Sequence, residues 1–201
     1  MSARHRLPAS LTVLLVLSAL GVVHAPAEVG AQARDNTARP LAGAAAPIVI
    51  GRAGTGLPGP VADMREAILE AVRSGRIEEL RHAIELNELK PVIGDGTSDD
   101  PIATLRQLSV DGEGRDILAV LGRLLEGGWA AVPLGPDIEN NRIYVWPHFA
   151  ATGVVGLSAE AQAELERLAP PDVWNAMLRA GTYSYWRIGI GPDGTWHSLT
   201  R

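Results

Sequence analysis

The chain of 201 residues contains no cysteine. This absence excludes disulfide bonds, thiol catalysis and cysteine-based zinc sites, and it excludes a lipid anchor attached to an N-terminal cysteine. An oxidising compartment permits disulfides but does not require them in a domain of this size. Any stability of the fold must therefore come from packing and hydrogen bonding.

The chain also lacks a cluster of basic residues. Its formal net charge is -5 at pH 7. Binding to phosphate backbones needs Lys and Arg gathered together, so the sequence argues against a nucleic-acid partner. The same reasoning argues against binding to anionic lipid.

Familiar catalytic motifs are missing as well. There is no G-x-S-x-G, no H-E-x-x-H and no glycine-rich phosphate loop. His5 and His24 lie near the N-terminus, and the remaining three, His82, His148 and His197, do not show the spacing of metal ligands. We therefore expect no metal and no cofactor.

The N-terminal segment has the features of a signal peptide. Arg4 and Arg6 precede an uncharged apolar run over 11–23, which is shorter than the roughly 20 residues of a spanning helix. Residues 25–27 and 31–33 both fit the A-x-A cleavage pattern. We expect residues 1–33 to be removed by cleavage after Ala27 or Ala33. The protein would then be periplasmic or secreted, without stable membrane insertion, although an uncleaved anchor remains the alternative.

Two regions follow the signal segment. Residues 34–60 are rich in Gly, Pro and Ala and predict a flexible tether, in which the apolar patch 48–50 could instead form a short strand or lie on the domain. Residues 61–201 predict a single globular domain, because hydrophobic residues make up 46% of the chain.

The pattern along this domain predicts an α+β fold. An N-terminal helical hairpin and further helices are expected to pack with a small antiparallel sheet that ends in a C-terminal β-hairpin. Apolar spacing predicts helices near 61–74, 77–87, 101–108, 117–126, 158–168 and 172–180. Strands are predicted at 143–146 and on both sides of the turn 192–194.

The terminal hairpin allows its two faces to be assigned. If residues 192–194 form a three-residue loop with a bulge, residues 190 and 196 lie opposite each other. The predicted core face then comprises Trp186, Ile188, Ile190 and Trp196, and the other face comprises Tyr183, Tyr185, Arg187, His197 and Leu199. The tyrosines, Arg187 and His197 could bind a flat or sugar-like ligand, unless helices cover that face or it is a plain solvated sheet. A loop of another length would move Trp196 to the other face.

Two acidic segments are further candidates. Asp111, Glu113 and Asp116 could hold calcium, but the EF-hand order is missing, and a helix start is the preferred interpretation. Asp137 and Glu139 precede an aromatic strand that His148 follows, which is the mixture that a hydrolytic site on glycan or peptide would need. A polar turn that leads into a core strand is the preferred interpretation of the second segment.

Segments 140–147 and 186–197 resemble those of a family of uncharacterised exported bacterial proteins of the alphaproteobacterial type. Residues 111–115 and the first helical hairpin are similar too, so the resemblance covers roughly 61–199. It implies one secreted domain, and it implies no activity.

The sequence thus favours a non-catalytic binding module for an envelope ligand or protein. The alternative is an envelope glycan or peptide hydrolase that uses Asp137, Glu139 and His148. The sequence does not decide whether the protein is an enzyme, and no catalytic motif supports an enzymatic function.

Overall fold

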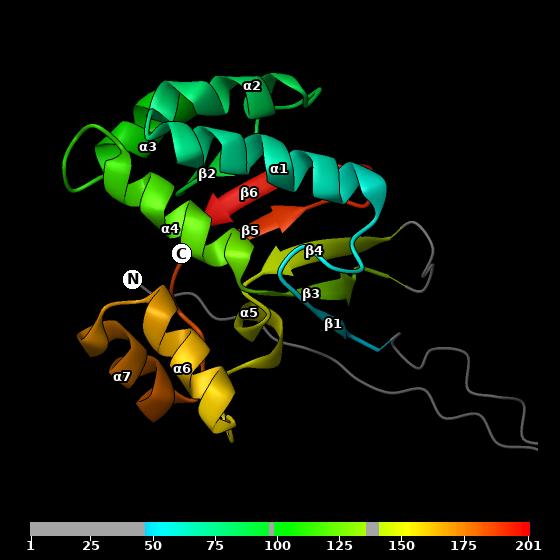
Figure 1. The fold of residues 1–201 in the computed structure, drawn as a ribbon, viewed down its shortest axis with the longest axis vertical. Coiled ribbons are helices and arrows are strands. Elements are labelled where there is room, and N and C mark those ends of the chain that lie inside the picture. Colours follow the sequence, from blue (N-terminus) through cyan, green and yellow to red (C-terminus); the bar gives the residue numbers. More distant parts are fainter. Residues whose placement is uncertain (1–46, 97–98, 136–140) are drawn as a thin grey trace, which may run out of the picture. The chain divides into compact units, whose positions relative to one another are not determined.

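A six-stranded sheet forms the centre of the computed structural model, which describes residues 47–96, 99–135 and 141–201 (Figure 1). The strand order is β1-β3-β4-β5-β6-β2, and the β2–β6 pair alone is parallel. The strands are β1 (Val49–Arg52), β2 (Val92–Ile93), β3 (Gly128–Pro133), β4 (Arg142–Trp146), β5 (Arg187–Ile190) and β6 (Trp196–Thr200).

Seven α-helices are present in the described residues, and Figure 1 shows them in two groups. The first group lies on one side of the sheet: α1 (Gly59–Ser74), α2 (Leu80–Glu85), α3 (Pro101–Leu108) and α4 (Arg115–Glu126). The second group is α5 (Phe149–Thr152), α6 (Ala159–Leu168) and α7 (Pro171–Ala180). The predicted α+β class and the C-terminal hairpin are confirmed.

The helices predicted from apolar periodicity bury the faces that the pattern indicated. In α4, six apolar side chains between Ile117 and Leu125 are buried, and α4 contacts α1, β3 and β5. Helix α3 begins as the sequence suggested: Pro101 is its first residue, and the Asp100 carboxylate accepts hydrogen bonds from the backbone N–H groups of Ile102 and Ala103. The core therefore lies between the first helix group and the sheet, and it continues into the second group through Phe149, Leu165, Leu168 and Met177.

The helix expected over 77–87 is shorter and less regular. A 3₁₀ turn at Ile77–Glu79 leads into α2, which ends at Glu85. The Asn87 amide donates to the carbonyls of Ala83 and Ile84, and its oxygen accepts from Trp196 N at 2.8 Å. Such side-chain bonds compete with continued helix. The predicted N-terminal helical hairpin is not confirmed.

Residues 49–52 form β1, which is the strand alternative that the sequence left open. β1 pairs antiparallel with β3 and places Gly51 opposite Trp129. A Cβ atom at residue 51 would lie 2.2 Å from the Trp129 ring, so glycine is required for this close approach. The prediction of a tether therefore applies only to residues 34–46. These residues and the predicted signal segment at 1–33 lie outside the described residues.

The C-terminal hairpin confirms the core face and corrects one position on the other. Ile190 pairs with Trp196 as predicted, and both are fully buried. A bulge follows, in which His197 is the extra residue, because Gly189 pairs with Ser198. The bulge interrupts the alternation of side chains. Leu199 therefore faces the core opposite Ile188, and its predicted place on the outer face is wrong.

None of the helices in the described residues combines the length and the apolar character needed to cross a membrane.

Candidate functional site

The four residues predicted to form a ligand-binding face do not share one open surface. Tyr183 is 5% exposed, and its hydroxyl donates to the Trp186 carbonyl at 2.7 Å. Burial raises the pKa of the Tyr183 hydroxyl. Tyr185 is half-buried against the core, whereas Arg187 and His197 are exposed. The expected placement of Tyr183 at an open face is wrong, because its ring packs toward Phe149.

Of the three catalytic candidates, Asp137 and Glu139 lie outside the described residues. His148 follows β4, in which Tyr144 and Trp146 are buried on the core face. Its backbone N–H donates to Gly128 O at 2.9 Å, which holds the start of α5 against the start of β3. The described part of this region is therefore a core strand that ends at a histidine.

His148 lies beside a glutamate from α6. His148 Nε2 is 4.0 Å from Glu164 Oε2, and His148 Nδ1 is 3.4 Å from Thr152 Oγ1. Glu164 Oε1 accepts a hydrogen bond from Gly128 N at 2.7 Å. A Cβ atom at residue 128 would lie 2.7 Å from the His148 ring, so glycine there allows the ring and the carboxylate to meet.

The surroundings of His148 favour the neutral imidazole. Burial lowers its pKa most strongly, and the positive charge of Arg52 lowers it further, while the negative charge of Glu164 acts in the opposite direction. The His148 side chain is 15% exposed and that of Glu164 is 25% exposed, so both remain within reach of a ligand.

A surface hollow extends from this pair and is lined by arginines. We call this hollow the arginine cleft. Its charged lining residues are Arg52, Arg123, Arg167, Glu126, Glu160 and Glu164. Its two adjoining cavities measure about 370 Å³ and about 270 Å³, and the second also contacts His148. The larger volume lies at the lower end of the range for small-molecule sites, and the smaller volume lies slightly below that range.

The three guanidinium groups of the cleft reach it from distant parts of the sequence. Arg52 ends β1, Arg123 lies on α4 and Arg167 lies on α6. None of the three forms a hydrogen bond or ion pair through its guanidinium with another residue in the described part of the chain. Other arginines of the protein do pair: Arg106 with Glu78, and Arg73 with Glu66.

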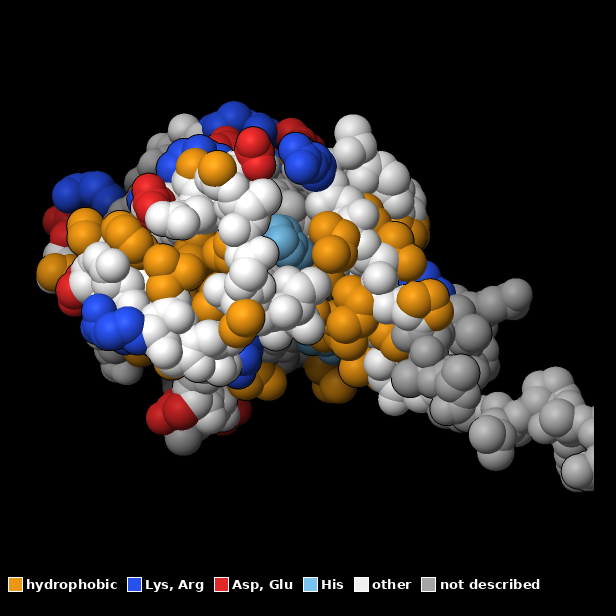
Figure 2. Space-filling view, turned by 90° about the horizontal axis from the view of Figure 1, so that it is seen from below, with side chains coloured by type: hydrophobic (Ala, Val, Ile, Leu, Met, Phe, Trp, Pro, Cys, Tyr) orange, Lys and Arg blue, Asp and Glu red, His pale blue; other side chains and the backbone are white. Residues whose placement is uncertain are grey.

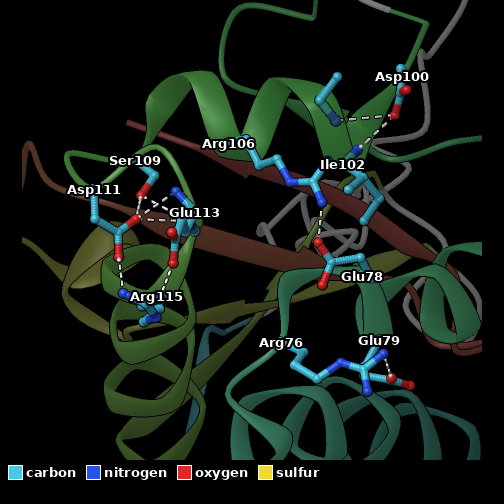
Figure 3. A network of polar contacts seen from close by, with 12 residues as sticks. Arg76, Glu78, Glu79, Asp100, Ile102, Arg106, Ser109, Asp111, Glu113 and Arg115 are labelled. Carbon is cyan, nitrogen blue, oxygen red and sulfur yellow. Dashed lines mark hydrogen bonds and ion pairs between the residues drawn. The ribbon is translucent and has the colours of Figure 1, made fainter.

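The acidic segment at 111–116 serves as the entry to α4 (Figure 3). Asp111 Oδ1 accepts from the backbone N–H groups of Glu113 and Gly114, both at 2.8 Å, and Asp116 accepts from Val110 N at 3.1 Å. The Ser109 hydroxyl, the backbone N–H of Gly114 and the positive charge of Arg115 lower the pKa of Asp111. The carboxylates bind local donors, which agrees with the preferred interpretation as a helix start.

Across residues 47–96, 99–135 and 141–201, no group of three or more His, Asp or Glu side chains is arranged to hold a metal ion. Figure 2 views the molecule from below and shows its hydrophobic side chains in separate patches, with histidine at the surface between them. The exposed apolar residues Ile48, Val49 and Ile50 belong to β1 and the residue before it.

Sequence reasoning missed Arg52, Arg123, Glu164 and Arg167. Glu164 and Arg167 are three residues apart, so they lie on one face of α6, which is the single local signal available. Their approach to Arg52 and Arg123 depends on how β1, α4 and α6 meet.

Comparison with known proteins adds no information about this site. No protein-family model, no curated protein and no solved structure matches the chain.

Proposed function

We propose that this protein is an exported binding module that holds a small anionic ligand in the arginine cleft. The observation that carries the proposal is the presence of three guanidinium groups, from β1, α4 and α6, that line one hollow without carboxylate partners among the described residues. Export rests on the predicted signal segment at 1–33, and the binding role continues the non-catalytic interpretation of the sequence.

Guanidinium groups suit this role because they stay charged and present a planar fork of donors to carboxylate or phosphate. A single exposed arginine needs no explanation, since water solvates it well. Three arginines from separate segments line this hollow beside Glu126, Glu160 and Glu164, and none of the three is held in an ion pair by those carboxylates. An anion bound there would gain charge-assisted hydrogen bonds without displacing existing ion pairs.

Isothermal titration calorimetry with inorganic phosphate and with acetate tests the proposal. Arg167→Gln removes one charge of the cleft, and Arg81→Gln removes an exposed charge on α2 as a matched control. We expect binding of at least one anion that Arg167→Gln weakens by about tenfold, which corresponds to one lost charged hydrogen bond. Equal effects of the two substitutions, or no binding of either anion, would contradict the proposal.

A hydrolase is the second candidate, and the His148–Glu164 pair favours it. A neutral imidazole can accept a proton from water, and a neighbouring carboxylate can orient the ring. The bound anion would then be part of a substrate, and Asp137 and Glu139 remain further candidates for the acid. Turnover of p-nitrophenyl acetate or phosphate that His148→Gln abolishes and His197→Gln preserves would support this candidate. Absence of turnover would leave the binding module.

A further inference from the structure

The arginine cleft contains carboxylates as well as unpaired cations. Glu164 lines both of its cavities, whereas Glu126 lines one and Glu160 lines the other. Glu164 Oε1 is occupied by the Gly128 N–H, whereas Glu164 Oε2 has one basic neighbour among the described residues, the His148 imidazole at 4.0 Å. Burial keeps the pKa of that imidazole below its ordinary value, so it supplies no positive charge at neutral pH. The Glu164 side chain is still 25% exposed to the cleft.

These opposite charges line the same hollow but do not pair with each other. None of Arg52, Arg123 and Arg167 reaches Glu164 within ion-pair distance. The Gly128 N–H holds the Glu164 carboxylate, and the three arginines reach the cleft from three different elements. A simple anion would satisfy the guanidiniums but would lie near a fixed negative charge.

From this separation we infer that the ligand of the arginine cleft is a small zwitterion of the α-amino acid type. Its carboxylate would contact the guanidinium groups, and its ammonium group would donate to Glu164 Oε2. This inference rests on the proposed function, because it names the class of ligand for the same cleft. The cavity volumes of about 370 and 270 Å³ suit a molecule of this size.

The two ends of such a ligand reinforce each other. A ligand with only a carboxylate or only an ammonium group forms one charged contact and lies near a protein group of its own charge. A molecule that carries both groups pairs with the arginines and with Glu164 at once. Affinity should therefore depend on having the carboxylate and the ammonium in one molecule. This requirement separates the inference from general anion binding.

The test uses three probes that differ only in their charged groups. L-Alanine carries both groups, propionate carries the carboxylate alone, and ethylamine carries the ammonium alone. Calorimetric titration should show L-alanine binding at least about tenfold more tightly than propionate, with ethylamine weaker still. Glu164→Gln keeps an acceptor for the Gly128 N–H, so it should weaken L-alanine, leave propionate as tight or tighter, and thereby remove the preference for L-alanine.

Glu166→Gln is the matched control, because Glu166 lies two residues further along α6 and accepts from Gln162. It should leave the preference for L-alanine intact. If propionate or phosphate binds as tightly as L-alanine and Glu164→Gln changes neither, the inference is overturned while the proposed function stands. If none of the three probes binds and neither phosphate nor acetate binds, both the inference and the proposed function fail.

Discussion

Replacement of Gly51 by alanine should release β1 from the sheet, because Trp129 occupies the space that a side chain would need. The added Cβ would lie 2.2 Å from two atoms of the Trp129 ring, far inside van der Waals contact. Trp129 is itself 4% exposed and packs toward Tyr144, so it has little room to move. Overpacking of this kind costs about 1–3 kcal/mol.

Gly59→Ala provides the control, since no atom lies within 4 Å of a Cβ at that position. Gly59 is the first residue of α1, where alanine restricts the unfolded chain and should stabilise the protein by about 0.4–1 kcal/mol. The two substitutions add the same methyl group, so the difference between them reports the contact with Trp129.

Urea unfolding gives the free energy of unfolding of both variants, and thermal unfolding provides a second measure. In a domain of this size, a loss of 1 kcal/mol corresponds to a fall of about 2–4 °C in melting temperature. Gly51→Ala should also weaken anion binding, since Arg52 follows Gly51 in β1. The reasoning would be refuted if Gly51→Ala were as stable as Gly59→Ala.

Three further predictions concern the hairpin, the histidine and the N-terminus. Trp196→Ala should lower the free energy of unfolding by about 3–5 kcal/mol because the side chain is fully buried. His197→Ala, on the outer face, should lower it by about 1 kcal/mol or less. Equal losses of the two variants in urea unfolding would show that both faces are buried. Burial holds the pKa of His148 below its ordinary value of 6.5 in the folded protein. The stability that the buried, neutral His148 side chain contributes is therefore complete above pH 6.5, and it is lost as the pH falls toward the folded pKa. His148→Gln should therefore lose less stability than the original protein on acidification, and parallel melting-temperature profiles would contradict this. Mass spectrometry of the protein from its native envelope should show that at least residues 1–27 are absent, and an intact N-terminus would exclude cleavage.

Sequence patterns predicted the elements that local physics determines. The spacing of apolar residues identified α1 and α4, and the Pro-Asp-Gly turn correctly paired Ile190 with Trp196. The bulge at His197 was missed because strict alternation cannot show where an extra residue enters a strand. Leu199 was misplaced for that reason.

The short α2 and the candidate site were missed for a different reason. Asn87 ends α2 by bonds that include the backbone of Trp196, which is distant in sequence. The arginine cleft likewise joins Arg52, Arg123 and Arg167, and each of these arginines looks like an ordinary solvated residue in its own segment. His148 was a candidate from the sequence, but its partner Glu164 emerges only when α6 packs beside the start of β3.

The most direct test of ligand binding in the arginine cleft is a titration of the ¹⁵N-labelled protein with L-alanine and inorganic phosphate, followed by amide chemical shifts. The Gly128 amide donates to Glu164, and Gly127 and Gly128 both line the cleft, so these two amides should shift with saturation as ligand is added. The Arg52 amide should shift with them. Shifts confined to the surface around Arg76, Arg106 and Arg115, or no saturable shift at Gly127 and Gly128, would contradict a binding function for the cleft.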